Sequence, residues 1–506
     1  MPNSRARALR AAVPLALAVA AAALAQQAED PGEPWRLGSL ELRSCTIGAT
    51  SAHGLPSEAA FCTDLEVPED WDHPLGRRIR LRVAVVRALA AQPDRDVAVF
   101  LDGGPGGAAT QDYPAVAAAL SGVRRQHHLL LVDQRGTGGS NALDCAPAGS
   151  AAEDDAADDA PGGAARQARV ARCARRLSQR AALQFYATTD AVRDLEAVRL
   201  ALGAPPLDLV GVSYGTRVAQ QYARRYPQAV RRMVLDSSVP NPLVLLSEHA
   251  RNLEDAVRRR LELCRRDTAC FLHYGDSYEA LRSVHRHLRG QPQDVEMRDP
   301  QSFALVHRRL GAGELAALVR FYAYSAATST LLPYVIAEAQ AGRYAPLLSQ
   351  AQLVVGDVAE HLNGGMAATV LCTEDADLLR EQRQDEDTLL GAAILSEARE
   401  ACAAWPHGRR PDDFHEPFRG SMPTLVLAGE LDPVTPPRYG EQIVAGLPHA
   451  RLLVAPGQGH AVLGQGCLPR LVGEFLDGLD LERLDGGCLQ SLGPLPFFLD
   501  VNGPSP

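Results

Sequence analysis

Short apolar runs recur along the chain, and each ends in a loop rich in glycine or charged residues. They span residues 79–88, 97–101, 129–132, 207–210, 233–235, 424–428 and 452–455. Segments with apolar residues at helical spacing lie at 189–202, 216–225 and 468–479, where Thr188 or Thr189 is expected to cap the first helix and Gly203 to end it. Strands alternating with helices predict an α/β fold, with a mostly parallel central sheet covered by helices on both faces.

Two segments interrupt this alternation. Residues 146–165 are rich in Ala, Asp and Gly, which is typical of a solvated surface insertion. Residues 240–419 have mainly helical patterning and lie between two predicted sheet strands. We expect them to form an inserted helical cap or, less specifically, a helical decoration over the strand ends. The sheet domain is then built from residues 26–239 and 420–506.

The first 25 residues resemble a targeting segment. Arg5, Arg7 and Arg10 precede an apolar run at 11–24, and the small residues of Ala23–Ala25 provide a cleavage site. We expect a signal peptide at 1–25 and a secreted or periplasmic protein that does not associate with the membrane after cleavage; an uncleaved anchor is the alternative. The run is too short to cross a bilayer comfortably.

Composition narrows the possible chemistry. The formal net charge of −10 gives no sign of nucleic-acid binding. All 51 basic residues are arginine, so a Schiff-base lysine, a P-loop lysine and a Ser–Lys dyad are excluded. The sequence has no H-E-x-x-H motif, and we expect neither a metal site nor a cofactor.

The ten cysteines fall into neighbouring couples, as expected for disulfides in an exported protein. Sequence alone does not fix their connectivity, and some couples are free buried thiols in the alternative interpretation. The hypothesis is that neighbours pair, which gives Cys45–Cys62, Cys145–Cys173, Cys264–Cys270, Cys372–Cys402 and Cys467–Cys488.

The strongest chemical motif is Gly211-Val-Ser213-Tyr-Gly215, between a predicted strand and a predicted helix. A sharp strand-to-helix turn exposes a serine hydroxyl above a sheet, and the turn needs glycines two residues to either side. The motif therefore predicts Ser213 as a nucleophile and the chain as a serine hydrolase of the α/β-hydrolase fold.

A serine nucleophile needs a base and an acid, which in this fold follow it in the order acid, then histidine. His460 follows a late strand on a glycine-rich loop, and Asp432 follows the strand before it. We expect Ser213, Asp432 and His460 to form a catalytic triad. Glu430 and Asp236 are the competing choices for the acid.

The oxyanion of the tetrahedral intermediate needs two backbone N–H donors. The first is expected at Tyr214, directly after the nucleophile. The second is expected at Gly104, because the glycines of 103–107 let the backbone approach a ligand closely; an ordinary glycine turn is the alternative. Arg135 is expected to tie loops together beneath the site.

These motifs together resemble the peptidase family that includes the proline iminopeptidases, and most of all its secreted tripeptidyl aminopeptidase branch. The resemblance rests on Gly103–Gly107, Asp133–Gly138 with Cys145, Gly211–Thr216, Arg232–Asp236, Cys372 with Glu374 and Asp375, Cys402 with Trp405 and Pro406, Asp432–Pro436, Gly459 with His460, Cys467 and Cys488. The chain departs from the family at Asp102, Ala108 and Ala461, where histidine, serine and glycine are common.

The resemblance implies peptide substrates cleaved near a free N-terminus. An anion in the cap must then hold the substrate ammonium, and Glu374 or Asp375 is the expected amine anchor; a solvated acidic helix end is the alternative. A carboxylesterase or lipase-like enzyme uses the same triad, and a binding protein without activity is a third possibility. The sequence predicts no oligomeric state.

Overall fold

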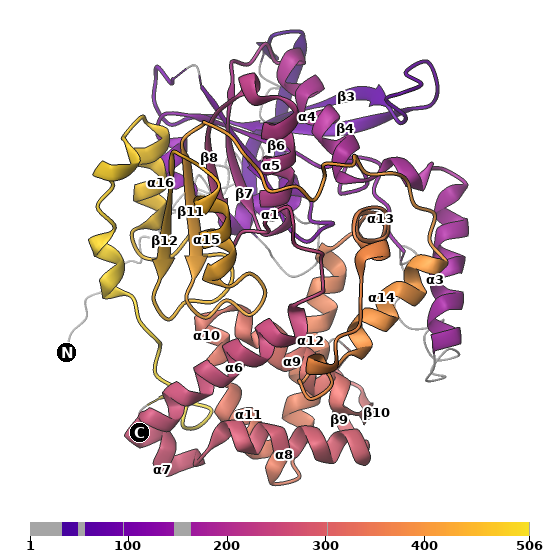
Figure 1. Ribbon diagram of the computed structural model, residues 1–506, viewed down its shortest axis with the longest axis vertical. Helices are drawn as coiled ribbons and strands as arrows, with labels where there is room; N and C mark the ends of the chain where they lie inside the picture. The colour runs from indigo at the N-terminus through magenta and orange to yellow at the C-terminus, as the bar shows by residue number, and fades with distance from the viewer. Residues whose placement is uncertain (1–32, 49–55, 95, 146–162, 301, 505–506) are drawn as a thin grey trace, which may run out of the picture.

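A ten-stranded sheet forms the centre of the computed structural model, which describes residues 33–48, 56–94, 96–145, 163–300 and 302–504 (Figure 1). Its strand order is β1-β2-β3-β4-β6-β5-β7-β8-β11-β12. The strands are β1 (Trp35–Leu37), β2 (Leu40–Ile47), β3 (Glu58–Pro68), β4 (Arg78–Val86), β5 (Val97–Leu101), β6 (His128–Val132), β7 (Leu207–Val212), β8 (Val230–Asp236), β11 (Thr424–Gly429) and β12 (Ala450–Ala455). The strands from β6 to β12 are parallel to one another, whereas β1 to β4 are antiparallel.

All seven predicted strands are present, and they occupy the sheet from β4 to β12. The sequence analysis did not identify β1, β2 and β3, which lie at one edge of the sheet. Their residues mix buried, half-buried and exposed positions instead of forming continuous apolar runs. An antiparallel edge with one solvated face gives this weaker pattern.

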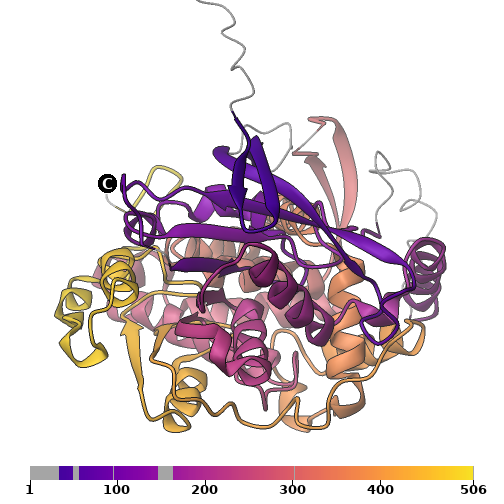
Figure 2. The ribbon, with the colours of Figure 1, turned by 90° about the horizontal axis from the view of Figure 1, so that it is seen from above.

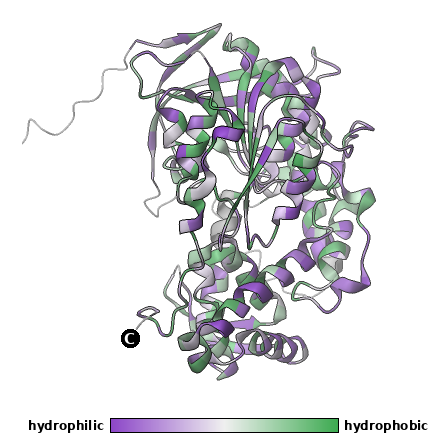
Figure 3. Cartoon of the chain, turned by 60° about the vertical axis from the view of Figure 1, so that its left-hand side comes forward, coloured by the Kyte–Doolittle hydropathy of each residue, from purple (hydrophilic) through white to green (hydrophobic). Residues whose placement is uncertain are grey.

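Successive strand residues point to opposite sides of the sheet, so an apolar strand offers apolar side chains on both faces. Helices cover both of these faces. Leu130 packs into the core on one face, whereas Leu129 and Leu131 pack into the core on the other. The first face is covered by α4 (Thr188–Ala201), α5 (Tyr214–Arg225) and α15 (Pro437–Ala445), and the second by α1 (Ala109–Val116), α2 (Ser121–Arg124) and α16 (Leu468–Leu476). Figure 2 shows the sheet between these layers, and Figure 3 shows its apolar strands.

Helix α4 begins differently from the prediction. Its N-cap residue is Ala187, not Thr188 or Thr189, and Ala187 has no side chain that can cap the helix. The N–H of Thr188 instead donates to the carboxylate of Glu374, which is distant in sequence. At the other end Gly203 has a φ of 62°, which confirms the expected helix stop.

The segment between β8 and β11 lies to one side of the sheet, below it in Figure 1. It contains α6 (His249–Arg266), α7 (Thr268–Tyr274), α8 (Ser277–Gly290), a hairpin of β9 (Gln293–Arg298) and β10 (Leu305–Leu310), α9 (Ala312–Tyr324), α10 (Ala326–Ser329), α11 (Leu332–Gln340), α12 (Ala345–His361), α13 (Gly364–Glu374) and α14 (Ala393–Ala403). Most of these helices pack around an apolar core separate from the sheet. The boundaries between this inserted segment and the sheet domain, at residues 240 and 419, stay a prediction.

Five disulfides link the same neighbouring cysteines that the sequence analysis paired. The end of the chain returns to the inserted segment, where the hydroxyl of Tyr274 donates to the carbonyls of Phe498 and Leu499. Among the residues described, none of the helices combines the length and the apolar character needed to cross a membrane. The predicted signal peptide and nearly all of the 146–165 insertion lie outside the described residues.

Candidate active site

Ser213 occupies the sharp turn between β7 and α5, with φ 53° and ψ −123°. Both flanking glycines are required there: a Cβ on Gly211 would lie 2.7 Å from the carbonyl oxygen of Gly215, and one on Gly215 would lie 2.0 Å from that of Leu101. The serine is half-buried, and its hydroxyl makes no hydrogen bond to a described residue. Hydrogen bonds between a catalytic nucleophile and its base are often long until substrate binds.

Asp432 and His460 are in direct contact although 28 residues separate them. The Nδ1 atom of His460 lies 2.8 Å from Oδ2 of Asp432. The carboxylate also accepts the hydroxyl of Thr435 at Oδ2 and the N–H groups of Val434 and Thr435 at Oδ1, each at 2.8 Å. These bonds hold the carboxylate in one orientation toward the imidazole.

The two competing acids have other partners. Oδ1 and Oδ2 of Asp236 accept the N–H groups of Val462 and Leu463, at 3.1 and 2.7 Å. Glu430 accepts the N–H of Gly457 and pairs with a surface arginine. Both carboxylates therefore fix the loop that carries the histidine, and neither hydrogen-bonds the imidazole of His460.

Backbone contacts join the serine turn to the histidine loop. The N–H of Ser213 donates to the carbonyl of Asp236 at 2.9 Å, and the hydroxyl of Ser237 accepts the N–H of Ala461 at 2.8 Å. Because β7, β8, β11 and β12 are consecutive parallel strands, their carboxyl ends meet at one edge of the sheet. All three predicted triad residues follow strands at this edge.

The charges of the pair support each other. Burial alone would raise the pKa of Asp432, but the charge of His460 and the hydrogen bonds outweigh it and lower the pKa below its usual value. Burial likewise opposes protonation of His460, yet Asp432 raises the net pKa above that of an ordinary histidine. An imidazolium that forms during proton transfer is therefore stabilised here.

The predicted oxyanion donors flank the serine. Tyr214 is the first residue of α5, so its N–H has no partner within the helix. The glycine loop lies against Ser213, since a Cβ on Gly103 would be 3.1 Å from the serine Cβ. The N–H of Gly104 makes no hydrogen bond within the described chain. Both N–H groups are thus available for an acceptor.

A family model described as alpha/beta hydrolase fold matches residues 97–466. The chain belongs to the alpha/beta hydrolase fold family. This match confirms the predicted fold class, and it extends from the strand before the glycine loop to the residues beyond His460.

Two curated relatives of this alpha/beta hydrolase are peptidases by name. The chain is 25% identical over 466 residues to the tripeptidyl aminopeptidase of Streptomyces coelicolor, covering 86% of this chain and 84% of the relative. It is 27% identical over 462 residues to the serine protease Hip1 of Mycobacterium tuberculosis, covering 83% of this chain and 85% of the relative. These relatives confirm the resemblance and support a peptidase-like hydrolase.

One solved structure similar to this alpha/beta hydrolase is a proline iminopeptidase of Mycobacterium smegmatis, with 20% identity and a TM-score of 0.37. The match covers 82% of this chain and 98% of the other.

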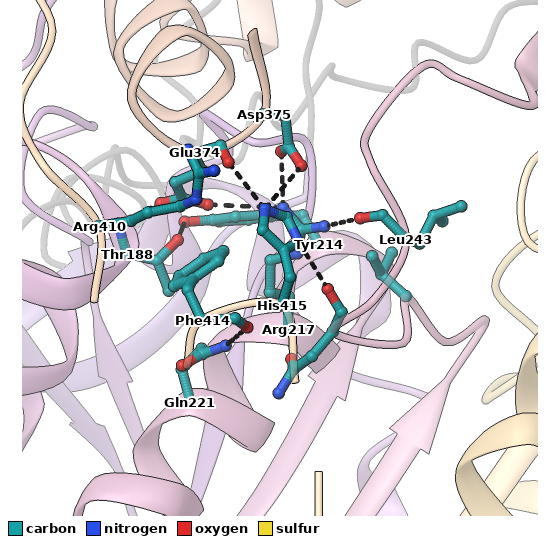
Figure 4. A network of polar contacts seen from close by, with 12 residues as sticks. Thr188, Tyr214, Arg217, Gln221, Leu243, Glu374, Asp375, Arg410, Phe414 and His415 are labelled. Atoms are coloured by element: carbon teal, nitrogen blue, oxygen red, sulfur yellow. Dashed lines mark hydrogen bonds and ion pairs between the residues drawn. The ribbon is translucent and has the colours of Figure 1, made fainter. Parts of the chain in front are cut away.

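Glu374 and Asp375 of this alpha/beta hydrolase lie in a buried cluster with Arg217 and Thr188 (Figure 4). They are 1% and 0% exposed, and both face Arg217 of α5: Nη1 of the arginine is 2.8 Å from Asp375 and 3.5 Å from Glu374. Burial raises the pKa of Glu374 to about 7, although Arg217 opposes the rise. Their predicted role as amine anchor stays a prediction.

Arg135 is fully buried beneath the site of the alpha/beta hydrolase. Its Nε and Nη2 atoms donate to the two oxygens of Asp194, both at 2.6 Å, and Nη1 donates to the carbonyls of Glu69 and Phe185. The residue therefore ties β3 and α4 to the loop after β6, as expected from the sequence.

Several neighbours of the imidazole in this alpha/beta hydrolase were not identified from the sequence. Thr435 lies three residues after Asp432, and that spacing in Asp432-Pro-Val-Thr435 was the available signal. Tyr324, at the end of α9, packs its ring edge-on to His460 with 5.0 Å between centroids. No local pattern could have indicated Tyr324, because the contact joins two separate parts of the chain.

Among the described residues of the alpha/beta hydrolase, Asp94, His127 and Asp477 form the group whose spacing suits a metal ion. His127 is buried and its Nε2 lies 3.0 Å from Asp477, whereas both aspartates are exposed. His127 precedes β6, so the group lies at the opposite end of the sheet from Ser213. It takes no part in the candidate active site.

Proposed function

We propose that this alpha/beta hydrolase is a secreted serine exopeptidase that cleaves peptides near a free N-terminus. The observation that carries the proposal is the 2.8 Å contact between Asp432 and His460, at the sheet edge where Ser213 occupies a strained turn. The relatives named tripeptidyl aminopeptidase and serine protease support peptide substrates.

In the proposed reaction, the hydroxyl of Ser213 attacks the scissile carbonyl while His460 accepts its proton. Asp432 keeps Nδ1 of the imidazole protonated and stabilises the imidazolium. The N–H groups of Tyr214 and Gly104 bind the oxyanion. His460 then gives the proton to the leaving amine, and water, deprotonated by the same imidazole, hydrolyses the acyl-enzyme.

Export and a cap complete the proposal. Residues 1–25 act as a cleaved signal peptide, and the five disulfides suit an oxidising compartment. Residues 240–419 act as a cap over the sheet edge that carries the triad, between core parts 26–239 and 420–506. We also retain Glu374 or Asp375 as the amine anchor, to be tested by kinetics of Glu374→Gln and Asp375→Asn.

A panel of mono-, di- and tripeptidyl chromogenic amides, run beside simple esters, tests the function. We expect turnover of amides with a free N-terminus and loss of that turnover in Ser213→Ala. A fluorophosphonate probe should label the natural protein and not the variant. Failure of the probe to label Ser213 would contradict the enzymatic function and favour a binding protein on a hydrolase scaffold.

A carboxylesterase or lipase-like enzyme is the second candidate, and one observation favours it. Both predicted amine anchors are buried and already face Arg217, so neither offers an open carboxylate to an ammonium group. Ester hydrolysis needs no such anchor. A matched pair of substrates with free and acetylated N-termini separates the two functions, because only an exopeptidase prefers the free amine.

A further inference from the structure

The last turn of α9 is fixed against the loop that carries the catalytic histidine. The N–H of His460 donates to the carbonyl of Tyr324 at 2.7 Å. Gly459 fits beneath this turn only because it lacks a side chain, since a Cβ there would lie 2.2 Å from the same carbonyl oxygen. The inserted segment therefore places residues of α9 directly beside the candidate active site.

Arg320 lies one helical turn before Tyr324. Residues four apart share one face of a helix, so Arg320 lies on the side of α9 that meets the histidine loop. Its charge acts on the groups nearby: the pKa of His249 is lowered to about 3, first by burial and then by Arg320. Arg320 also opposes the net rise in the pKa of His460.

This guanidinium has no carboxylate partner among the described residues, and it lies over the ring of its chain neighbour Phe321, with 5.4 Å between the guanidinium carbon and the ring centroid. Its Nε atom is buried without a hydrogen bond, and none of its nitrogens forms an ion pair with a described residue. The Nε atom of Arg217 is also buried without a hydrogen bond, but its Nη atoms bind the carboxylate of Asp375 and the carbonyl of Leu243. An arginine stays charged at any physiological pH, and an unmatched buried donor destabilises the protein. A cation beside a catalytic imidazole and without a counter-charge from the chain is explained if an anionic group of the substrate binds to it.

We propose that Arg320 binds a carboxylate on the leaving-group side of the scissile bond. The inference rests on the proposed peptidase function, in which His460 delivers a proton to the leaving amine, so the part of the substrate nearest the imidazole is the leaving part. Guanidinium groups match carboxylates with two parallel hydrogen bonds. The carboxylate is either the C-terminus of a short peptide or an Asp or Glu side chain that follows the cleaved bond.

Carboxylate binding also assists the chemistry. The charge of Arg320 disfavours the imidazolium form of His460, and a bound anion neutralises that charge. Part of the interaction is therefore gained as the imidazolium forms, which raises kcat as well as lowering KM. If Arg320 merely packed in the cap, replacing it would leave the ratio of charged to neutral peptide unchanged in both kcat and KM.

Two pairs of peptides test the proposal: the alanine tetrapeptide as free acid and as amide, and a longer peptide with Asp or Asn after the cleaved bond. We expect the natural enzyme to prefer the charged member by about 10- to 100-fold in kcat/KM. Arg320→Gln should abolish the preference while retaining turnover of the neutral members. Arg289→Gln, an exposed arginine on α8, is the matched control and should keep the preference.

Each pair has its own outcome. A preference confined to the tetrapeptides identifies the C-terminal carboxylate, and one confined to the longer peptides identifies the side chain. Equal rates on charged and neutral members, or a preference that survives in Arg320→Gln, overturn the proposal while leaving the peptidase function intact.

A binding measurement tests the role of Arg320 independently of peptide hydrolysis. In the inactive Ser213→Ala variant, the dipeptide Ala-Ala should raise the melting temperature more than its amide does, and the difference should vanish in Ser213→Ala/Arg320→Gln. Equal shifts overturn the role of Arg320 even if no peptide is turned over. Absence of all turnover in the natural protein refutes the proposed function instead.

Discussion

Replacing Asp432 by asparagine tests the geometry of the site most directly. Two backbone N–H groups, of Val434 and Thr435, meet the carboxylate at Oδ1, both at 2.8 Å. These donors require an oxygen, so the amide oxygen of the new residue must take that position. The amide nitrogen then faces Nδ1 of His460, where the carboxylate oxygen stood at 2.8 Å. A donor in this place forces Nδ1 to become an acceptor.

The proton of the neutral imidazole must then move to Nε2, which can no longer accept the proton of Ser213. By analogy with other triads, we expect kcat to fall by about 10⁴, or about 5.4 kcal/mol in barrier height. The assay is steady-state hydrolysis of the best chromogenic peptide, with circular dichroism and melting curves to verify folding. Substrate binding should change little, because the residue does not contact substrate.

Glu430→Gln is the matched control. It removes a carboxylate two residues away that contacts Gly457 and a surface arginine rather than the imidazole, and activity should be nearly unchanged. If Asp432→Asn folds and keeps more than about a tenth of the natural kcat, the tautomer argument is refuted. A larger loss in Asp236→Asn than in Asp432→Asn would transfer the role of the acid to Asp236.

Three further predictions follow from the site and its supports. The pKa of His460 is raised, so kcat/KM should fall on the acid side with an apparent pKa above the ordinary value of about 6.5. Protonated His460 contributes its full stabilisation below that ordinary value, and this contribution is lost as pH rises through the pKa of the folded protein. The stability of the natural protein relative to His460→Gln should therefore decline over the same pH range in which activity rises. Arg217→Leu leaves two buried carboxylates without their cation and should cost about 3–5 kcal/mol in urea unfolding, against about 0.5 kcal/mol or less for the exposed Arg225→Leu. Gly215→Ala places a Cβ 2.0 Å from a backbone oxygen and should abolish labelling by a fluorophosphonate, whereas Gly290→Ala, with nothing within 4 Å, should label normally.

Each of these has a contradicting result. An acid limb at or below the ordinary histidine pKa would mean that the Asp432 charge does not act on His460 as the distances indicate. Equal unfolding free energies for the two arginine variants would show that the buried cluster is hydrated. Normal labelling of Gly215→Ala would show that the serine turn tolerates a side chain.

The sequence by itself determined the central strands and the serine turn. Runs such as 129–132 are apolar throughout because both sheet faces are covered, and this leaves a readable local signal. The glycine at 211 is equally local, because its crowding arises against Gly215 and Thr216 in the same turn, whereas the crowding at Gly215 comes from Leu101 at the end of β5. Strands β1 to β3 left a weaker signal, since exposed and half-buried positions interrupt their buried ones.

Tertiary structure alone decided which acid meets the histidine, because Asp236, Glu430 and Asp432 all follow strands at the same sheet edge. Side-chain direction, fixed by backbone donors on separate loops, chose Asp432. The same holds for Glu374, whose carboxylate accepts the first N–H of α4, a contact made across 186 residues. That Arg320 forms no ion pair with a described residue is also a property of the fold, because whether a charge has a partner depends on neighbours that chain order does not record.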